Sequence, residues 1–162
     1  MAADDIGPYS RGEVGISTFS GSVGGVGIGS VIESGWSFSG AAGYQINPFF
    51  GLEGELGVTR NNIVFGLGDI TTVPVLGNAV FTMPLGDTAN FLITAGAGWG
   101  FVSASVQNEA LVGDGAIGQL KAAVNFSLTD KTSLHAGYAL RAYFEDTSIR
   151  QNIFSVGVRI KF

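Results

Sequence analysis

The sequence predicts an all-β protein: one domain over residues 1–162 that forms an eight-stranded antiparallel up-and-down transmembrane β-barrel. The last twelve residues, QNIFSVGVRIKF, alternate between an apolar face and a face of small or basic residues, as a strand with two different surroundings does. Charged residues are only 13% of the chain and the mean hydropathy is +0.36. Even so, no run of ~18 consecutive apolar residues occurs, so no transmembrane helix is expected. The 26 glycines disfavour helices and suit tight turns and crowded barrel interiors.

Eight alternating segments follow one another along the chain. In order, we expect strands at Pro8–Ser20, Gly35–Ile46, Phe49–Val58, Thr72–Leu85, Phe91–Val106, Ala116–Leu128, Thr132–Phe144 and Gln151–Phe162. The turn signal Asn47-Pro48 and residues 86–90 and 129–131 mark short connections. Residues 21–34, 59–71, 107–115 and 145–150 form longer connections between the other strands. No segment has a helical period, which excludes βαβ units and leaves a meander of hairpins.

Each segment is assigned as a strand because its apolar residues fall on one face. From the first strand to the last, the apolar faces hold Val14 and Ile16; Trp36, Phe38, Ala42, Tyr44 and Ile46; Phe50, Leu52, Leu56 and Val58; Val73, Val75, Ala79, Phe81 and Met83; Phe91, Ile93, Ala95, Ala97, Trp99 and Phe101; Leu120, Ala122, Val124, Phe126 and Leu128; Leu134, Ala136, Tyr138, Leu140 and Phe144; and Phe154, Val156, Val158, Ile160 and Phe162. The opposite faces are mostly glycine, serine and asparagine with isolated charges, and they include Asn78 and Gln119.

The choice between a soluble barrel and a membrane barrel depends on where the apolar faces point. The small opposite face lacks the charge that a soluble surface needs, and it suits the narrow lumen of about eight strands. Aromatic residues gather near both strand ends, as the two girdles of a membrane barrel do. Those towards the long connections are Trp36, Phe38, Trp99, Phe101, Phe144 and Phe154, and those towards the short turns are Tyr44, Phe50, Phe81, Phe91, Phe126 and Phe162. We therefore predict that the apolar faces meet lipid.

The ionisable residues of the inner faces form a candidate lumenal charge network. Its members are Arg11, Glu13, Glu53, Glu55, Lys121, His135, Arg141 and Arg159. Opposite charges in a narrow lumen pair to offset desolvation. Two interpretations remain open: a salt-bridge plug that makes the barrel rigid, or a gate that opens a narrow ion or small-solute path. Closure of the barrel should also bring Arg159 near Glu13, because the last strand must pair with the first.

No catalytic, cofactor or metal site is predicted. His135 is the only histidine and the chain has no cysteine, which argues against a metal site. Ser133 shares its face with His135, but strand neighbours two residues apart do not by themselves make the geometry of a hydrolase. The net charge of −5 argues against nucleic acid as a partner.

The longer connections contain exposed-looking apolar residues that are candidates for contact with a host protein or an apolar ligand. They include Val26, Ile28, Val31, Ile63, Phe65 and Leu67. Apolar loops are costly unless they bind something or pack on each other. Acidic residues outnumber basic ones in these connections, which disfavours heparin-like polyanions because like charges repel.

Three stretches resemble the small opacity-type outer membrane proteins of Gram-negative bacteria: the terminal SVGVRIKF, the segment GWSFSGAAGYQINPFFGLEGELG, and HAGY at 135–138. That group includes the neisserial surface protein A barrel and the alphaproteobacterial 25-kDa outer membrane proteins. The resemblance implies a monomeric, non-enzymatic surface protein that lies among membrane lipid and lipopolysaccharide. It also implies that the barrel-assembly machinery inserts the chain, with Phe162 as part of the insertion signal. MAADDIGPY has no signal-peptide pattern, so we expect an exported mature chain with an added Met and a periplasmic tail over residues 1–7.

Overall fold

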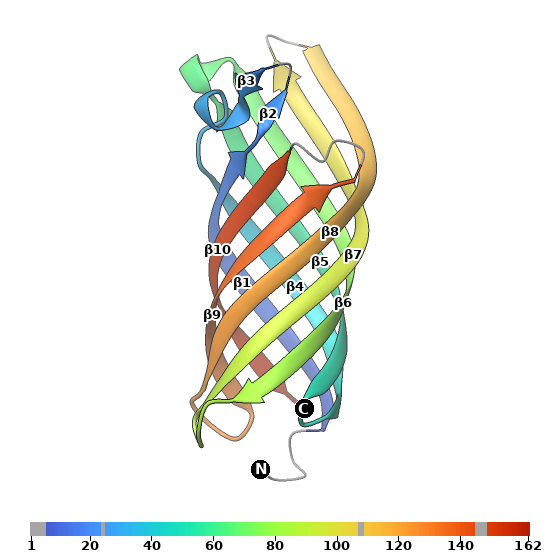
Figure 1. The fold of residues 1–162 in the computed structure, drawn as a ribbon, viewed down its shortest axis with the longest axis vertical. Helices are drawn as coiled ribbons and strands as arrows, with labels where there is room; N and C mark the ends of the chain where they lie inside the picture. Colours follow the sequence, from blue (N-terminus) through green and yellow to red (C-terminus); the bar gives the residue numbers. More distant parts are fainter. Residues whose placement is uncertain (1–5, 24, 107–108, 145–148) are drawn as a thin grey trace.

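The computed structural model describes residues 6–23, 25–106, 109–144 and 149–162. Its eight long strands close into one antiparallel barrel in the order β1-β10-β9-β8-β7-β6-β5-β4 (Figure 1). These strands are β1 (Gly7–Ser20), β4 (Gly35–Asn47), β5 (Phe50–Ile63), β6 (Gly68–Pro84), β7 (Ala89–Val106), β8 (Glu109–Ser127), β9 (Thr132–Tyr143) and β10 (Arg150–Lys161). The predicted fold class is confirmed, and the first strand pairs with the last from Tyr9↔Lys161 to Ser20↔Arg150.

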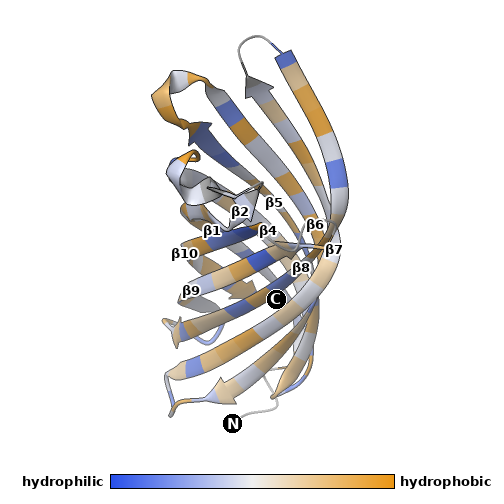
Figure 2. Ribbon diagram, turned by 45° about the horizontal axis from the view of Figure 1, so that its top comes forward, coloured by the Kyte–Doolittle hydropathy of each residue, from blue (hydrophilic) through white to orange (hydrophobic). Residues whose placement is uncertain are grey.

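The alternation of the sequence becomes the inside and outside of the barrel. In β1 the buried side chains of Arg11 and Glu13 point into the lumen, whereas Val14 and Ile16 are exposed on the outer wall. Figure 2 shows the same alternation as bands of opposite hydropathy along most strands. The outer wall therefore carries the large apolar residues, and most buried side chains of the lumen are polar or charged.

The strands are longer at one end of the barrel than the sequence suggested. β5 and β6 stay paired from Thr59↔Thr72 to Ile63↔Gly68, so the connection expected at 59–71 shrinks to the 3-10 turn η3 (Val64–Gly66) and Leu67. β8 begins at Glu109, where a loop was expected. The polar residues of these stretches suggest a loop when the sequence is considered alone. In the structure, however, Thr59 and Asn61 are inward-facing strand residues with buried side chains.

The first long connection has some regular structure of its own. It contains the two-stranded ribbon β2 (Ser22–Val23) and β3 (Val26–Gly27), followed by the 3-10 turn η2 (Ile28–Ser30). Residues Val31 to Glu33 then run along the end of β5. Among the described residues, no helix is long and apolar enough to cross a membrane.

The two ends of the barrel differ. The short turns between β4 and β5, β6 and β7, and β8 and β9 lie at the same end as the start of β1 and the end of β10, which we call the short-turn end (Figure 1). At the opposite, tall end, β7 and β8 rise well above β9 and β10 (Figure 1). Inside the barrel Val80, Leu92 and Ala123 form a small buried apolar cluster, whereas most of the other buried side chains of the lumen are polar or charged.

Candidate functional site: a lumenal charge network

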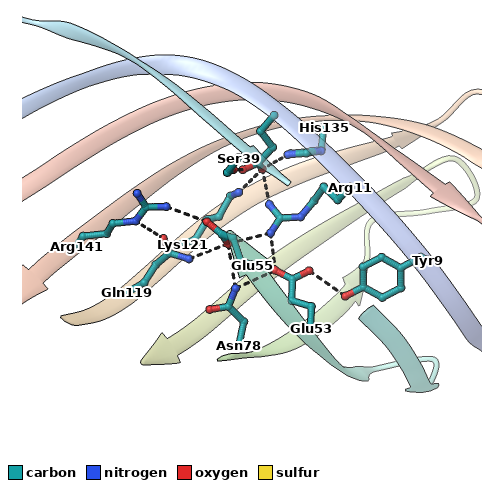
Figure 3. A network of polar contacts seen from close by, with 11 residues as sticks. Tyr9, Arg11, Ser39, Glu53, Glu55, Asn78, Gln119, Lys121, His135 and Arg141 are labelled. Carbon is teal, nitrogen blue, oxygen red and sulfur yellow. Dashed lines mark hydrogen bonds and ion pairs between the residues drawn. The ribbon is translucent and has the colours of Figure 1, made fainter. Parts of the chain in front are cut away.

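Inward-facing residues of four strands bring three carboxylates and their partners together inside the barrel. Arg11 and Glu13 come from β1, Glu53 and Glu55 from β5, Lys121 from β8, and His135 and Arg141 from β9. All seven side chains are buried. Figure 3 shows them converging with several polar neighbours, so the network spans the lumen from wall to wall.

Arg11 lies at the centre of the network. Its Nη1 forms an ion pair with Glu13 on the same strand. Its Nη2 reaches across to β5, where it pairs with Glu53 and lies 3.2 Å from Oε2 of Glu55. One guanidinium therefore contacts all three carboxylates. Arginine suits such a multiple contact, because its planar guanidinium group presents several N–H donors in fixed directions.

Glu13 contacts donors on its own strand, β1, and on the late strands β8 and β9. Besides Arg11, its Oε1 contacts Nζ of Lys121 and Nε2 of His135. The hydroxyl of Ser39 donates to its Oε2 at 3.1 Å. A buried carboxylate with this many partners is compensated for the water it loses.

Glu55 is held from the opposite side of the lumen. Arg141 Nη2 lies 2.8 Å from its Oε1, and the side-chain amides of Asn78 and Gln119 donate to its Oε2 at 3.0 and 3.2 Å. Gln119 in turn accepts a hydrogen bond from Nε of Arg141 at 2.7 Å. The two amides thus bridge the charged residues, which fixes their orientation.

Glu53 connects the network to the short-turn end. Its Oε1 also accepts from Asn78 Nδ2 at 3.0 Å, and its Oε2 accepts from the Tyr9 hydroxyl at 3.0 Å. Arg159 stacks on the Tyr9 ring with 3.6 Å between its Cζ and the ring centroid. The ring also lies directly against the backbone of Gly43, so it is packed between a cation and a residue without a side chain.

The register of β1 and β10 gives the position of Arg159 relative to Glu13. Arg159 lies opposite Arg11, whereas Glu13 lies opposite Gly157. The guanidinium of Arg159 stacks on Tyr9 and donates to the Gln45 side chain at 2.9 Å. β1 and β10 pair as expected, but the described contacts of Arg159 belong to a second layer nearer the short-turn end.

The network leaves little free space in the lumen. The voids beside it, one lined by Tyr9 and His135 and the other by Ser37 and Ser155, each measure about 10 Å³, about the volume that one water molecule needs. Three carboxylates face Arg11, Lys121 and Arg141, so the centre is close to charge balance. The described side chains of the network can therefore hold charges and exclude solvent at this level of the lumen.

The remaining candidate residues lie as follows. Ser133 and His135 share the lumenal face of β9 and both are buried, and Nε2 of His135 is directed to Glu13. No group of three or more metal-ligating side chains is found within the described ranges. Tyr9, Ser39 and Gln45 were not predicted as network residues. The period-two alternation of the sequence could have identified them, because each occupies an inward position of its strand, two or four residues from another inward-facing residue.

The residues of the predicted aromatic girdles lie on the outer wall, but Trp99 and Phe101 are not at a strand end, because β7 continues to Val106. Ten of the twelve residues are exposed, and Phe50 and Phe91 are half-buried. Phe50 stacks against Phe81 on the neighbouring strand, with ring centroids 5.3 Å apart. Tyr138, which is outside the predicted girdles, packs similarly against Phe154 at 4.9 Å.

The loop candidates are partly described. Phe65 is 92% exposed, Val31 and Leu67 are exposed to a smaller degree, and Ile63 is half-buried. The side chains of Val26 and Ile28 lie outside the described part of the structure, as do residues 1–5 of the expected tail.

Comparison with known proteins now places the chain in a family. The family described as outer membrane protein beta-barrel domain matches residues 1–162, and no curated protein matches the chain. The structure is similar to neisserial surface protein A, with 19% identity, a TM-score of 0.76, and coverage of 96% of this chain and 97% of that one. It is similar to Ail of Yersinia pestis, with 17% identity, a TM-score of 0.63, and coverage of 96% and 99%. It is also similar to the N-terminal barrel domain of Pseudomonas aeruginosa OprF, with 13% identity, a TM-score of 0.63, and coverage of 96% and 98%.

Identities this low show a shared fold, whereas the family match covers the whole chain. The resemblance to small outer membrane barrels is confirmed at the level of family and fold. The chain therefore belongs to the outer membrane protein beta-barrel domain family, and it is an integral protein of the bacterial outer membrane.

Proposed function

We propose that the protein is a non-conducting, non-enzymatic outer membrane barrel that acts through its outer wall and through contacts at its tall end. The short-turn end and both termini lie in the periplasm, and the tall end faces outwards. The wall contacts membrane lipid and lipopolysaccharide, the barrel is a monomer in its membrane, and the assembly machinery inserts it by reading the strand that ends in Phe162. The charge network packed across the lumen is the observation that supports the proposal.

The lumen is closed by residues that hold one another. Each carboxylate of the network contacts at least two other side chains, and the adjacent voids measure about 10 Å³ each. Opening an ion path would separate buried opposite charges, and breaking such a pair by removing one partner costs about 3–5 kcal/mol. This favours a plug over a gate.

Planar-bilayer conductance tests the plug, after boiled and unboiled gel mobilities have shown that the refolded barrel is native. We expect the wild type to be silent. Under the gating alternative, Glu53→Ala and Arg159→Ala would raise conductance, whereas the matched Arg60→Ala, on an exposed ion pair with Asp69, would not. Discrete, reproducible openings in the wild type would reject the plug, and silence in both lumenal variants would reject the gate.

Contact through the tall end is supported by Phe65. Its side chain is almost fully exposed at the tip between β5 and β6. Its backbone has φ of 63°, a region that costs roughly 1–2 kcal/mol for a residue with a Cβ atom. An exposed aromatic residue held in an unfavourable conformation adds nothing to folding, so we assign it to contact with a host protein or an apolar ligand.

The charge of the tall end limits the chemical classes of partner that could bind there. Ail has been solved in complex with the heparin analogue sucrose octasulfate. In this chain the tall end carries Glu33, Asp69, Glu109 and Asp114, an acidic excess that disfavours such a polyanion. A partner with an apolar or basic surface would bind the tall end better than a polyanion would.

Phe65→Gly tests the contact without disturbing the fold, because glycine adopts positive φ at little cost. We expect an unchanged or slightly higher urea midpoint, together with reduced binding of labelled, barrel-containing nanodiscs to cultured epithelial cells. Deletion of residues 24–31 should likewise lower binding. Full retention of binding in both variants would reject contact through these loops.

A further inference from the structure

Within the part of the chain that the structure describes, the upper part of β8 has a partner strand on one side only, and we call its other side the open edge. β8 pairs with β7 from Glu109 onwards, but its pairing with β9 begins only at Ile117. The last bond on that side is donated by the amide of Phe144 to the carbonyl of Ala116. Among the described residues, no strand pairs with the stretch Glu109–Gly115 on the side away from β7, and Figure 1 shows this stretch rising above β9 at the tall end.

The open edge presents backbone hydrogen-bonding groups in a defined pattern. In an antiparallel ladder, every second residue directs both its N–H and its C=O to the same neighbouring strand. Ala116 directs its carbonyl to the β9 side. Ala110, Val112 and Asp114 therefore direct their N–H and C=O groups to the same open side.

Described residues cover the other edge of the tall end, whereas none of them pairs with this one. Val31 to Glu33 run along the end of β5, where the Glu33 amide donates to Asn62 and the Val64 amide donates to Val31. The open edge reads EALVGDG and contains neither proline nor lysine, two residues that commonly protect strand edges from pairing. Its Leu111 and Val112 are 63% and 83% exposed.

We propose that this edge pairs with the same edge of a second copy of the chain, in antiparallel register centred on Val112. In that register Val112 faces Val112 and Ala110 faces Asp114, so every free donor meets a free acceptor. A shift towards the barrel would match Ala110 with Ala116, whose carbonyl is already bonded to Phe144. The charges also fit, because Asp114 faces Ala110 and Glu109 faces Gly115, and no two acidic residues oppose each other.

The pairing joins copies in two facing membranes. Antiparallel pairing of one strand with itself requires the two copies to point in opposite directions, so each barrel stays a monomer within its own membrane. This rests on the outward placement of the tall end in the proposed function. One short edge buries less than the ~1,200 Å² of stable interfaces, but many pairs between two surfaces gain strength by multivalency.

Disulfide capture tests the pairing directly, because the chain has no cysteine of its own. Val112→Cys is placed in nanodiscs that hold one barrel each, so that only face-to-face encounters join two copies. Residues facing each other in such a pair lie about 5.5 Å apart at Cα, within disulfide range. The matched control is Ser103→Cys, which is exposed, lies opposite Val112 on β7, and would be about 14 Å from its counterpart at ~4.8 Å per strand.

We expect several-fold more covalent dimer from Val112→Cys than from Ser103→Cys after mild oxidation. Equal yields from the two variants, or no dimer from Val112→Cys, would overturn the proposal. Adding Ala110→Pro to Val112→Cys removes one edge N–H without touching the ladder to β7, and it should lower the yield to that of the control. Ala110→Val, which keeps the N–H, should not. These readouts are independent of conductance, so a failure here leaves the plugged lumen untouched.

Discussion

Arg11→Met tests how far the lumenal network stabilises the barrel. The side chain of Arg11 is buried and contacts Glu13, Glu53 and Glu55. Methionine keeps most of the length and apolar volume of arginine but removes the charge. The variant leaves three buried carboxylates facing Lys121 and Arg141, together with His135.

The expected loss of stability in Arg11→Met follows from the burial of Arg11 and from the number of carboxylates that it contacts. Removing one member of a buried ion pair destabilises a protein by about 3–5 kcal/mol. The matched control is Arg60→Met, because Arg60 is 53% exposed and its partner Asp69 26% exposed in their side chains. An exposed pair of this kind contributes about 0–1 kcal/mol. The same substitution should therefore have very different effects at the two positions.

Urea unfolding of the barrel in lipid vesicles, followed by tryptophan fluorescence, measures both costs. With a slope of ~2 kcal/mol per molar urea, Arg11→Met should lower the midpoint by about 2 M with the slope unchanged. Adding Glu53→Gln to Arg11→Met should restore part of the loss, with a coupling of roughly 0.5–3 kcal/mol. If Arg11→Met costs no more than Arg60→Met, the lumen is wet enough to screen its charges, and the reasoning for a plug fails.

Three further outcomes are expected. Gly43→Leu, against the ring of Tyr9, should destabilise the barrel by about 1–3 kcal/mol through overpacking, whereas Gly54→Leu, with open space at its Cβ position, should be tolerated in the same urea assay. Tyr9→Phe removes the hydroxyl bonded to Glu53 and should cost about 1 kcal/mol by the same measurement. Deletion of Phe162 should reduce the amount of barrel in outer membrane fractions of cells while leaving refolding into vesicles intact; equal levels in cells would remove its role as an insertion signal.

The period-two alternation of the sequence predicted most of the fold. It placed Arg11 and Glu13 inside and Val14 outside, and its eight two-faced segments predicted the closed sheet that the structure has. It missed the upper parts of β5 and β8, because Thr59 and Asn61 look like loop residues when read without a partner strand. Polar residues beyond the expected lipid band still alternate, and only pairing with a neighbour shows it.

The pattern identified the lumenal residues but not how they pair. Arg11 meets Glu53 across the lumen although another strand lies between β1 and β5. Such contacts depend on strand stagger and on side-chain length, and neither is readable from one chain. Tyr9 is not ionised at neutral pH and so is not in the predicted set of lumenal charges, but its ring packs against Arg159 inside the barrel.

The wide sequence separation within the charge network bears on how the barrel assembles. Glu13 lies on the first strand, but its partners Lys121 and His135 follow 108 and 122 residues later. A half-built sheet would carry this carboxylate into a poorly hydrated environment without those partners, which is strongly unfavourable. Neutralisation is complete only when the late strands arrive beside β1. Insertion and closure should therefore proceed together, and partly inserted open sheets should be short-lived.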